Sequence, residues 1–170
     1  STRVRSSAAS DVYKRQMNIR KGTMKDYDSI LKLLTQMEEV EVQLDSNLRI
    51  GYFNTDEGKN STKKALRKRN VIFLVAEDDN NCVIGFIFGK LLREVWWNYR
   101  PVAFINDFIV DSNYRRQGIG TKLVTEFENI AKQQGAFYIR LLAFPTNMPA
   151  VNFYKKHGLM EYSVYYQKEI

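Results

Sequence analysis

The chain has 170 residues, with 26 Lys and Arg against 19 Asp and Glu, which gives a formal charge of +7. Its one cysteine excludes an internal disulfide framework, and its one histidine excludes a His-rich metal site, so we expect no metal. No apolar run approaches the roughly 18 residues that span a bilayer, and the length suits one domain with a sizeable core. We therefore expect a globular, cytoplasmic protein without a membrane partner.

The N-terminal stretch over residues 6–16 reads SSAASDVYKRQ, a sequence that no element of the fold requires. It resembles the codon-by-codon translation of a transposase adapter used to prepare sequencing libraries. We therefore interpret residues 1–16 as a non-native, disordered segment and residues 17–170 as the domain. The segment holds four basic residues and one acidic residue, so the rest of the chain carries +4. That charge is too modest to predict a nucleic-acid partner.

The first part of the domain reads as a strand followed by two helices. A short strand is expected over 17–20. Thr23 and Asp26 have the spacing of a capping box, and apolar residues follow at helical spacing. An irregular stretch over 38–60 then precedes a basic helix over 61–69.

The middle of the chain is rich in β-branched and aromatic residues. Two such runs, over 71–77 and 82–92, are separated by Asp-Asp-Asn-Asn at 78–81, which is typical of a hairpin. An aromatic loop over 95–101 leads into a further strand over 103–110.

The last part returns to helical spacing. Apolar residues over 119–131 form one helix face, and Gly135 ends that helix. A buried strand over 137–144 follows, then a helix with Pro149 in its first turn, then one or two strands over 160–168. The element order predicts a single α/β domain with a mixed sheet.

The segment with the clearest chemistry joins a strand ending at Val110 to a helix that begins at two glycines. Backbone N–H groups at a helix N-terminus point outward and favour an anion. Gly118 and Gly120 remove the Cβ atoms that would hold a pyrophosphate away, and Arg115 and Arg116 add positive charge. The sequence therefore predicts a site for a phosphate-bearing ligand.

Two familiar phosphate-binding motifs do not fit this segment. A Walker loop needs a lysine after its second glycine, whereas Thr121 follows Gly120. A dinucleotide fingerprint needs three glycines early in the chain, and neither condition holds.

The segment resembles instead a signature of the GNAT superfamily of N-acetyltransferases. Residues 115–120, Arg-Arg-Gln-Gly-Ile-Gly, are similar to the Arg/Gln-x-x-Gly-x-Gly/Ala motif, and residues 110–115 match its usual lead-in. Residues 147–159, which include Asn147 and the Phe-Tyr-Lys-Lys-His-Gly run, resemble the second motif of the family. The resemblance extends over residues 17–170.

The resemblance implies a fold, a co-substrate and a set of contacts. The implied fold is a twisted, mixed and mostly antiparallel sheet of six to seven strands, with the fourth and fifth strands splayed and about four flanking helices. Acetyl-CoA is the implied co-substrate. The implied cofactor-binding residues are Phe108, Ile109, Val110, Arg115, Arg116, Gln117, Gly118, Ile119, Gly120, Thr121, Asn147, Ala150 and Tyr154.

The implied reaction is direct acetyl transfer to a primary amine of a small molecule or protein. The Tyr154 hydroxyl reaches the thioester sulfur and is the candidate for stabilising the departing thiolate. The proton acceptor is less clear, because Asn106 stands where spermidine-type relatives have a glutamate. Asn106 positions a water, or the base lies elsewhere, while strand alternation places Asp107 on the opposite face. Other candidates for the base are Glu38, Glu39, Glu41 and Glu94.

Several alternatives stay open at this point. The acidic run over 38–45 indicates either a cationic acceptor or an exposed helix face, and Trp96, Trp97 and Tyr99 form either an acceptor wall or packing contacts. A homodimer is possible by family analogy. A non-catalytic acyl-CoA sensor is the main rival function, and an acetyltransferase acting on aminoacyl-tRNA is a weaker one, supported only by the basic helix.

Overall fold

The computed structural model describes residues 17–93 and 100–168. These residues form one five-stranded sheet in the order β1-β2-β3-β4-β5, antiparallel except for the parallel β4–β5 pair. The strands are β1 (Asn18–Lys21), β2 (Val71–Glu77), β3 (Val83–Leu92), β4 (Val102–Val110) and β5 (Tyr138–Arg140). The α-helices are α1 (Tyr27–Glu41), α2 (Asp56–Arg67), α3 (Ile119–Gln133) and α4 (Met148–Lys156). The 3₁₀ turns are η1 (Met24–Asp26), η2 (Tyr52–Asn54) and η3 (Ser112–Tyr114).

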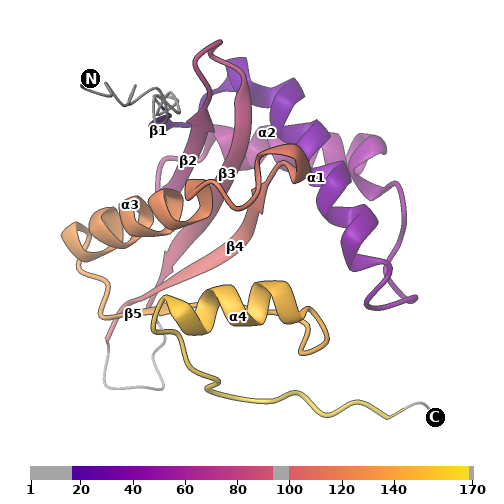
Figure 1. The fold of residues 1–170 in the computed structure, drawn as a ribbon, viewed down its shortest axis with the longest axis vertical. Helices are drawn as coiled ribbons and strands as arrows, with labels where there is room; N and C mark the ends of the chain where they lie inside the picture. The colour runs from indigo at the N-terminus through magenta and orange to yellow at the C-terminus, as the bar shows by residue number, and fades with distance from the viewer. Residues whose placement is uncertain (1–16, 94–99, 169–170) are drawn as a thin grey trace, which may run out of the picture.

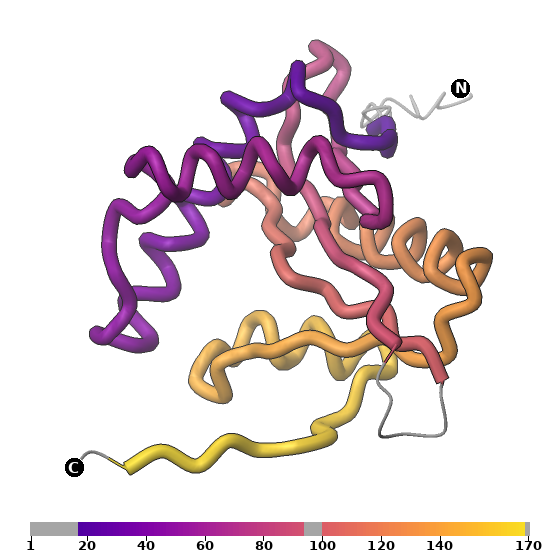
Figure 2. Tube along the Cα trace, turned by 180° about the vertical axis from the view of Figure 1, so that it is seen from behind, coloured from indigo at the N-terminus to yellow at the C-terminus, as the bar shows by residue number. Residues whose placement is uncertain are grey.

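Helices cover both faces of the sheet and bury a core on each (Figure 1). On one face, α3 inserts Leu123 and Phe127, both fully buried, against Ile72 and Ile87 of the sheet. On the other face, α1 and α2 cover Phe73, Val75 and Phe86 (Figure 2). This two-faced burial explains why the central strands are almost continuously apolar rather than alternating.

Strand β4 contains a bulge that reverses the facing of its second half. The register pairs Ile105 with Gly89 and Asp107 with Phe88, so Asn106 is an extra residue without a partner on β3. As a result Ile105 packs in the core under α3, whereas Ile109 packs under α1. The bulge therefore turns Asp107 toward the α1 side of the sheet.

The far side of β4 is open beyond the bulge. Strand β5 pairs only with residues 102–104, so among the described residues 105–110 have no strand neighbour on that side. Helix α4 lies beside this open edge (Figure 1). The predicted splaying of the fourth and fifth strands is seen here as an early end to their pairing.

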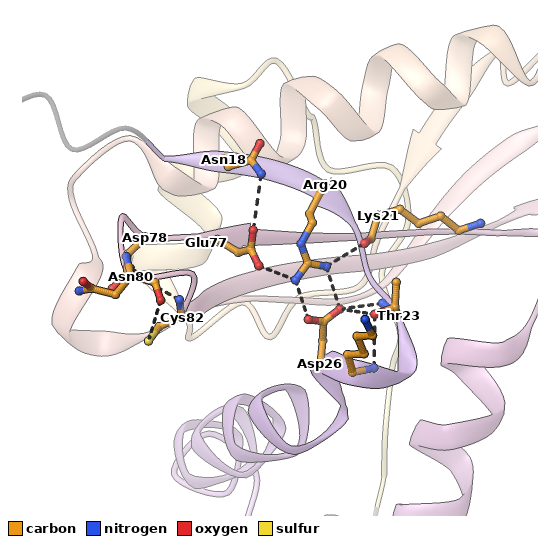
Figure 3. A network of polar contacts seen from close by, with 10 residues as sticks. Asn18, Arg20, Lys21, Thr23, Asp26, Glu77, Asp78, Asn80 and Cys82 are labelled. Atoms are coloured by element: carbon orange, nitrogen blue, oxygen red, sulfur yellow. Dashed lines mark hydrogen bonds and ion pairs between the residues drawn. The ribbon is translucent and has the colours of Figure 1, made fainter.

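The N-terminal part of the sheet is held by a buried ion-pair network (Figure 3). The predicted capping box is confirmed, because Thr23 N donates to Asp26 Oδ2 over 2.7 Å. The Arg20 guanidinium donates to both Asp26 oxygens, over 2.7 and 2.9 Å, and to Glu77 Oε1. Hydrogen bonds from Arg20 lower the pKa of Asp26 despite its burial.

The described part of the chain corrects three expectations about the elements. The sheet has five strands there rather than six to seven, because the strand expected over 137–144 is confined to Tyr138–Arg140 and residues 160–168 pair with no strand. Alternation made both segments compatible with a strand, but pairing also needs a neighbouring edge. The basic helix begins at Asp56 rather than residue 61, because the Thr55 side chain accepts from Gly58 N and caps it.

The expected fold class is confirmed. The chain forms a single α/β domain with a mixed sheet flanked by four α-helices in the described residues. None of the described helices is long and apolar enough to cross a membrane. The predicted loop residues Trp96, Trp97 and Tyr99, and the candidate base Glu94, lie outside the described residues.

Candidate functional site

The turn between β4 and α3 has the backbone geometry of an anion site. The Asp111 side chain accepts from Asn113 N over 2.9 Å, and Arg115 Nε donates to the Val110 carbonyl over 3.1 Å, so the turn is fixed from both ends. Arg116 and Gly118 have φ of 65° and 82°, which lifts the backbone into the first turn of α3. No side chain of the described residues caps α3, so its first N–H groups are available to face an anion.

The two glycines of the turn serve different purposes. A Cβ atom on Gly118 would meet nothing within 4 Å, so this position faces open space and is glycine because of its positive φ. A Cβ atom on Gly120 would lie 3.2 Å from Phe108 and 3.3 Å from Phe153. Gly120 therefore lets α3 approach the aromatic rings of β4 and α4, a packing role that the sequence did not reveal.

The predicted contact residues on β4 divide between the two faces. Phe108 points toward α4, with its ring 5.5 Å from Phe153 and 6.4 Å from Tyr154 between centroids. Ile109 is buried under α1, and Val110 packs on the α3 side. All three residues belong to the open edge of the strand. The backbone groups of this edge are available to a ligand lying beside β4.

Helix α4 carries the second predicted motif. The Asn147 side chain caps the helix by accepting from Ala150 N over 3.3 Å, which leaves its amide nitrogen as the group available to a ligand. At the other end, His157 Nε2 lies 3.2 Å from Thr121 Oγ1, and its ring contacts Phe153 at 4.4 Å. His157 thus ties α4 to the first turn of α3 and is half-buried rather than a solvated helix end.

Near the open edge of β4, the Glu41 carboxylate influences two other titratable side chains, Asp107 and Tyr154. Burial raises the pKa of Asp107 to about 6, and the nearby Glu41 carboxylate raises it further. Burial also raises the pKa of Tyr154 to about 12, again with a contribution from Glu41. The pKa of Glu41 itself is raised by burial and then by Glu38.

None of these three side chains has a hydrogen bond or an ion pair with another described residue. Buried polar groups in folded proteins are normally paired, and leaving a charge unpaired is costly. Perturbed and unpartnered groups that gather in one place are typical of a functional site. This region therefore contains three candidate functional groups, Asp107, Glu41 and Tyr154.

The other candidate bases are placed less favourably. Asn106 is exposed at the bulge, and no hydrogen bond joins its side chain to another described residue. Glu38 is buried, and its Oε1 accepts from Tyr52 N over 2.7 Å, which makes it a structural ligand of the η2 turn. Glu39 is exposed, and Asp45 accepts from Asn47 N over 2.9 Å.

Comparison with known proteins agrees with this geometry. The profile of the Acetyltransferase (GNAT) family matches residues 31–159, about three quarters of the chain. The chain belongs to the GNAT family of acetyltransferases. Members of this family use acetyl-CoA as the acetyl donor.

Two curated relatives and one solved structure show the range of similarity. The catalytic subunit NAA20 of the N-terminal acetyltransferase B complex of Arabidopsis thaliana is 33% identical over 93 residues, 53% of this chain and 51% of that protein. The thialysine N-epsilon-acetyltransferase of Sus scrofa is 26% identical over 153 residues, 82% of each. A tetramutant of the BH1408 protein from Bacillus halodurans superposes with a TM-score of 0.83 at 21% identity, covering 90% of this chain and 99% of that one. The chain thus spans about half the length of the first of these relatives.

The GNAT residues present in this chain fit acetyl-CoA. The turn at Arg116 and Gly118 offers free N–H groups and open space to a pyrophosphate, and Arg115 stands beside it. The unpaired edge of β4 offers backbone groups to a pantetheine arm. The Tyr154 ring, held against Phe108, stands beside that edge.

Asp107 is the functional candidate that sequence reasoning set aside. Strand alternation predicted that Asp107 and Phe108 lie on opposite faces of the sheet, which the structure confirms. Asp107 was therefore expected to point away from the reacting groups. The available signal was a carboxylate within the otherwise apolar strand Val102–Val110. What the sequence did not reveal was Glu41, which comes from the end of α1 and completes the environment.

Proposed function

We propose that this GNAT protein transfers an acetyl group from acetyl-CoA to a primary amine, with Asp107 as the proton acceptor. The observation that supports this assignment is the half-buried Asp107 carboxylate, which has no partner among the described residues and lies in the open half of β4, before the turn with the geometry of an anion site. Bound acetyl-CoA supplies a thioester whose carbonyl carbon is attacked by the amine nitrogen.

Asp107 suits a proton acceptor because it is ionised at neutral pH while remaining more basic than an ordinary aspartate. A free alkylamine has a pKa near 10.4, so roughly one molecule in a thousand is neutral at pH 7.4. Burial beside β4 lowers the pKa of an ammonium group and so increases its neutral fraction. As the nitrogen bonds to carbon its N–H becomes more acidic, and Asp107 takes the proton.

Tyr154 suits a hydrogen-bond donor to the departing sulfur. Its pKa of about 12 keeps the hydroxyl protonated at any physiological pH. A thiolate has a pKa near 8.5, so full transfer of the proton is uphill by roughly 3.5 units, or about 5 kcal/mol. Tyr154 therefore stabilises the developing negative charge through a hydrogen bond and keeps its proton.

The acceptor is an amine of a small molecule or of a protein side chain or terminus. The name of the Sus scrofa relative specifies an ε-nitrogen as its acceptor, and that of the Arabidopsis relative specifies a protein N-terminus. Both types present a primary amine on a carbon chain, which is what the Asp107 side of β4 would have to accommodate.

The direct test is acetyl-CoA-dependent thiol release with a panel of alkylamines, polyamines, amino acids, aminoglycosides and short peptides. Release above background with one class of amine is the expected result and identifies the acceptor at the same time. Saturable binding of acetyl-CoA without release for any amine would replace the enzyme with the rival function, a non-catalytic acyl-CoA sensor.

We also propose a homodimer, formed through the C-terminal segment 160–168. Both views show this segment running apart from the sheet (Figures 1 and 2), and Val164, Tyr165 and Tyr166 are 76%, 83% and 95% exposed. Two or three tyrosines and their apolar neighbours from each of two copies would bury on the order of 1,000 Å², enough for a specific interface. Light scattering after size exclusion should give twice the monomer mass, and Tyr166→Asp should halve it; a monomer in both would contradict the proposal.

Two further expectations remain proposals. We place the protein in the cytoplasm, where a reducing environment suits the exposed free thiol of Cys82.

We also regard residues 1–16 as a non-native extension that contributes nothing to activity. Removal of residues 1–16 should leave kcat and KM unchanged, and a loss of activity would contradict this view.

A further inference from the structure

A cavity of about 70 Å³ lies between the sheet and the helices α1 and α2. Among the described residues that line it, Asp107 is the one with a charge, and it stands on the β4 wall. The apolar walls are formed by Ile30, Leu34, Phe53, Ala65, Phe73, Phe86 and Phe88.

The two hydroxyl residues of the lining show where this cavity leads. Thr62 is buried, and its hydroxyl donates to the Gly58 carbonyl over 3.0 Å, so its proton is not free for a ligand. Ser61 is exposed on α2. The lining therefore includes the half-buried Asp107 on β4 and the exposed Ser61 on α2, with apolar side chains between them.

A packing defect alone explains this arrangement poorly. An unpartnered carboxylate against aromatic and aliphatic walls costs free energy, and nothing in the described structure pairs with it. A ligand with a cationic or hydrogen-bonding head and an apolar stem would satisfy both parts of the site together. Such a ligand would place its nitrogen at Asp107 and its carbon atoms in the cavity.

We propose that this cavity receives the carbon stem of the acceptor, so that the preferred acceptor is a primary amine on a short, unbranched, apolar stem. The proposal rests on the proposed function, because it takes Asp107 as the group that faces the amine. A cavity of about 150 Å³ holds benzene, so 70 Å³ holds roughly three carbon atoms. Acceptors with a hydroxyl or carboxylate within those three carbons are disfavoured, because the described walls beyond Asp107 are apolar apart from the exposed Ser61 and the Thr62 hydroxyl, whose proton is already donated.

A series of straight-chain amines from methylamine to hexylamine tests the proposal through kcat/KM for acetyl transfer. Burial of each methylene should raise kcat/KM roughly fourfold, up to about three carbons, after which the gain should stop. The hydroxyl-bearing analogue ethanolamine should fall well below propylamine. Equal kcat/KM values along the whole series would overturn the proposal while leaving the acetyltransferase activity intact.

Two cavity variants are compared, so that a folding defect in one of them does not decide the test. Ala65→Leu fills the space and should lower kcat/KM for propylamine by tenfold or more while sparing methylamine. Phe53→Ala enlarges it and should move the optimum to longer amines. Lys64→Leu, an exposed neighbour on the same helix, is the matched control and should keep the wild-type series.

The outcomes distinguish a failure of this proposal from a failure of the proposed function on which it rests. An optimum that moves in opposite directions in Ala65→Leu and Phe53→Ala supports a stem in the cavity. An unchanged optimum in both variants overturns it. No turnover of any amine by the wild-type protein overturns the proposed function and takes this inference with it.

Discussion

Two pairs of carboxylates lie near the two ends of the sheet, one pair buried and one half-buried, and their surroundings act in opposite directions on the pKa of Asp26 and on that of Asp107. At the β1–β2 end, Asp26 and Glu77 share the guanidinium of Arg20, and the pKa of Asp26 is lowered (Figure 3). At the β4 end, Asp107 and Glu41 have no cation among the described residues, and the pKa of each is raised.

The difference separates a structural role from a chemical one. A paired carboxylate stabilises the fold and offers nothing to a substrate. An unpaired one costs stability and keeps its lone pairs free for an incoming amine. The contrast predicts that removing a charge at one end weakens the fold, whereas removing it at the other weakens catalysis and strengthens the fold.

The largest expected effect comes from Asp107→Asn. Loss of the proton acceptor should lower kcat by about 10² to 10⁴. The raised pKa means that Asp107 contributes stability below its ordinary pKa of 3.8 and loses it as the pH rises through about 6. The variant should therefore be more stable than wild type above pH 6, by roughly 3 kcal/mol at most.

Urea unfolding at pH 8 and steady-state kinetics check both halves of this prediction. Asn106→Ala, at the exposed bulge beside it, is the matched control and should change kcat by less than about tenfold. A larger loss from Asn106→Ala than from Asp107→Asn would show that Asp107 is not the proton acceptor. It would instead support Asn106, the candidate predicted from the sequence.

The next effect is on the fold. Asp26→Asn breaks the pair with Arg20, and because Arg20 is one-third exposed the loss should be roughly 2 kcal/mol of unfolding free energy. Since the pKa of Asp26 is lowered, its contribution to stability is fully present above the ordinary pKa of 3.8 and is lost as the pH falls through the lowered pKa of the folded state. In urea unfolding the difference between the variant and wild type should shrink as the pH falls below 3.8, and the variant should keep its kcat at pH 7.5.

The control for this change is Asp28→Asn, an exposed aspartate in the first turn of α1. It should unfold within about 0.5 kcal/mol of wild type. Equal losses from the two variants would mean that the Arg20 network contributes nothing particular.

Tyr154→Phe should have a smaller effect, confined to activity. A hydrogen bond to a charged group contributes roughly 1.5 to 3 kcal/mol, so kcat should fall about 10- to 100-fold. The hydroxyl has no partner among the described residues, so the melting temperature should not fall. Tyr138→Phe, at a half-exposed tyrosine on β5, should leave kcat unchanged; an equal loss there would remove the special role of Tyr154.

The smallest effect tests the coupling between the carboxylates. Glu41→Gln removes a negative charge that raises the pKa of Asp107, so the pH midpoint of kcat/KM should move to lower pH by less than about one unit. Glu39→Gln, on the exposed side of α1, should leave the midpoint in place. A shift to higher pH in Glu41→Gln would contradict the arrangement.

Much of the fold was accessible from the sequence because its signals are local. The Thr23–Asp26 capping box and the strand Val71–Glu77 appear in the structure as expected, since a cap depends on three or four neighbouring residues and a buried strand on a short apolar run. The turn at Gly118 was equally local, because its positive φ and the helix that follows depend on adjacent residues.

The site depended on features that local patterns do not contain. The bulge at Asn106 arises where Gly89 allows the Phe104 carbonyl and the Phe127 ring to approach closely, so it involves three separate elements. The raised pKa of Asp107 depends on Glu41, which is 66 positions earlier in the chain. The missing strand over 160–168 shows the same limit, because alternation indicates a strand but does not supply its partner.

The measurement that tests the central claim most directly is the pH dependence of kcat/KM of the wild-type protein, from pH 4.5 to 9, with the best acceptor. If Asp107 accepts the proton, kcat/KM should rise through a midpoint near 6 and the Asp107→Asn variant should lack that midpoint. A steady rise up to pH 9 without an inflection near 6, equal in both proteins, would mean that only the free amine limits the reaction and that Asp107 is not its base.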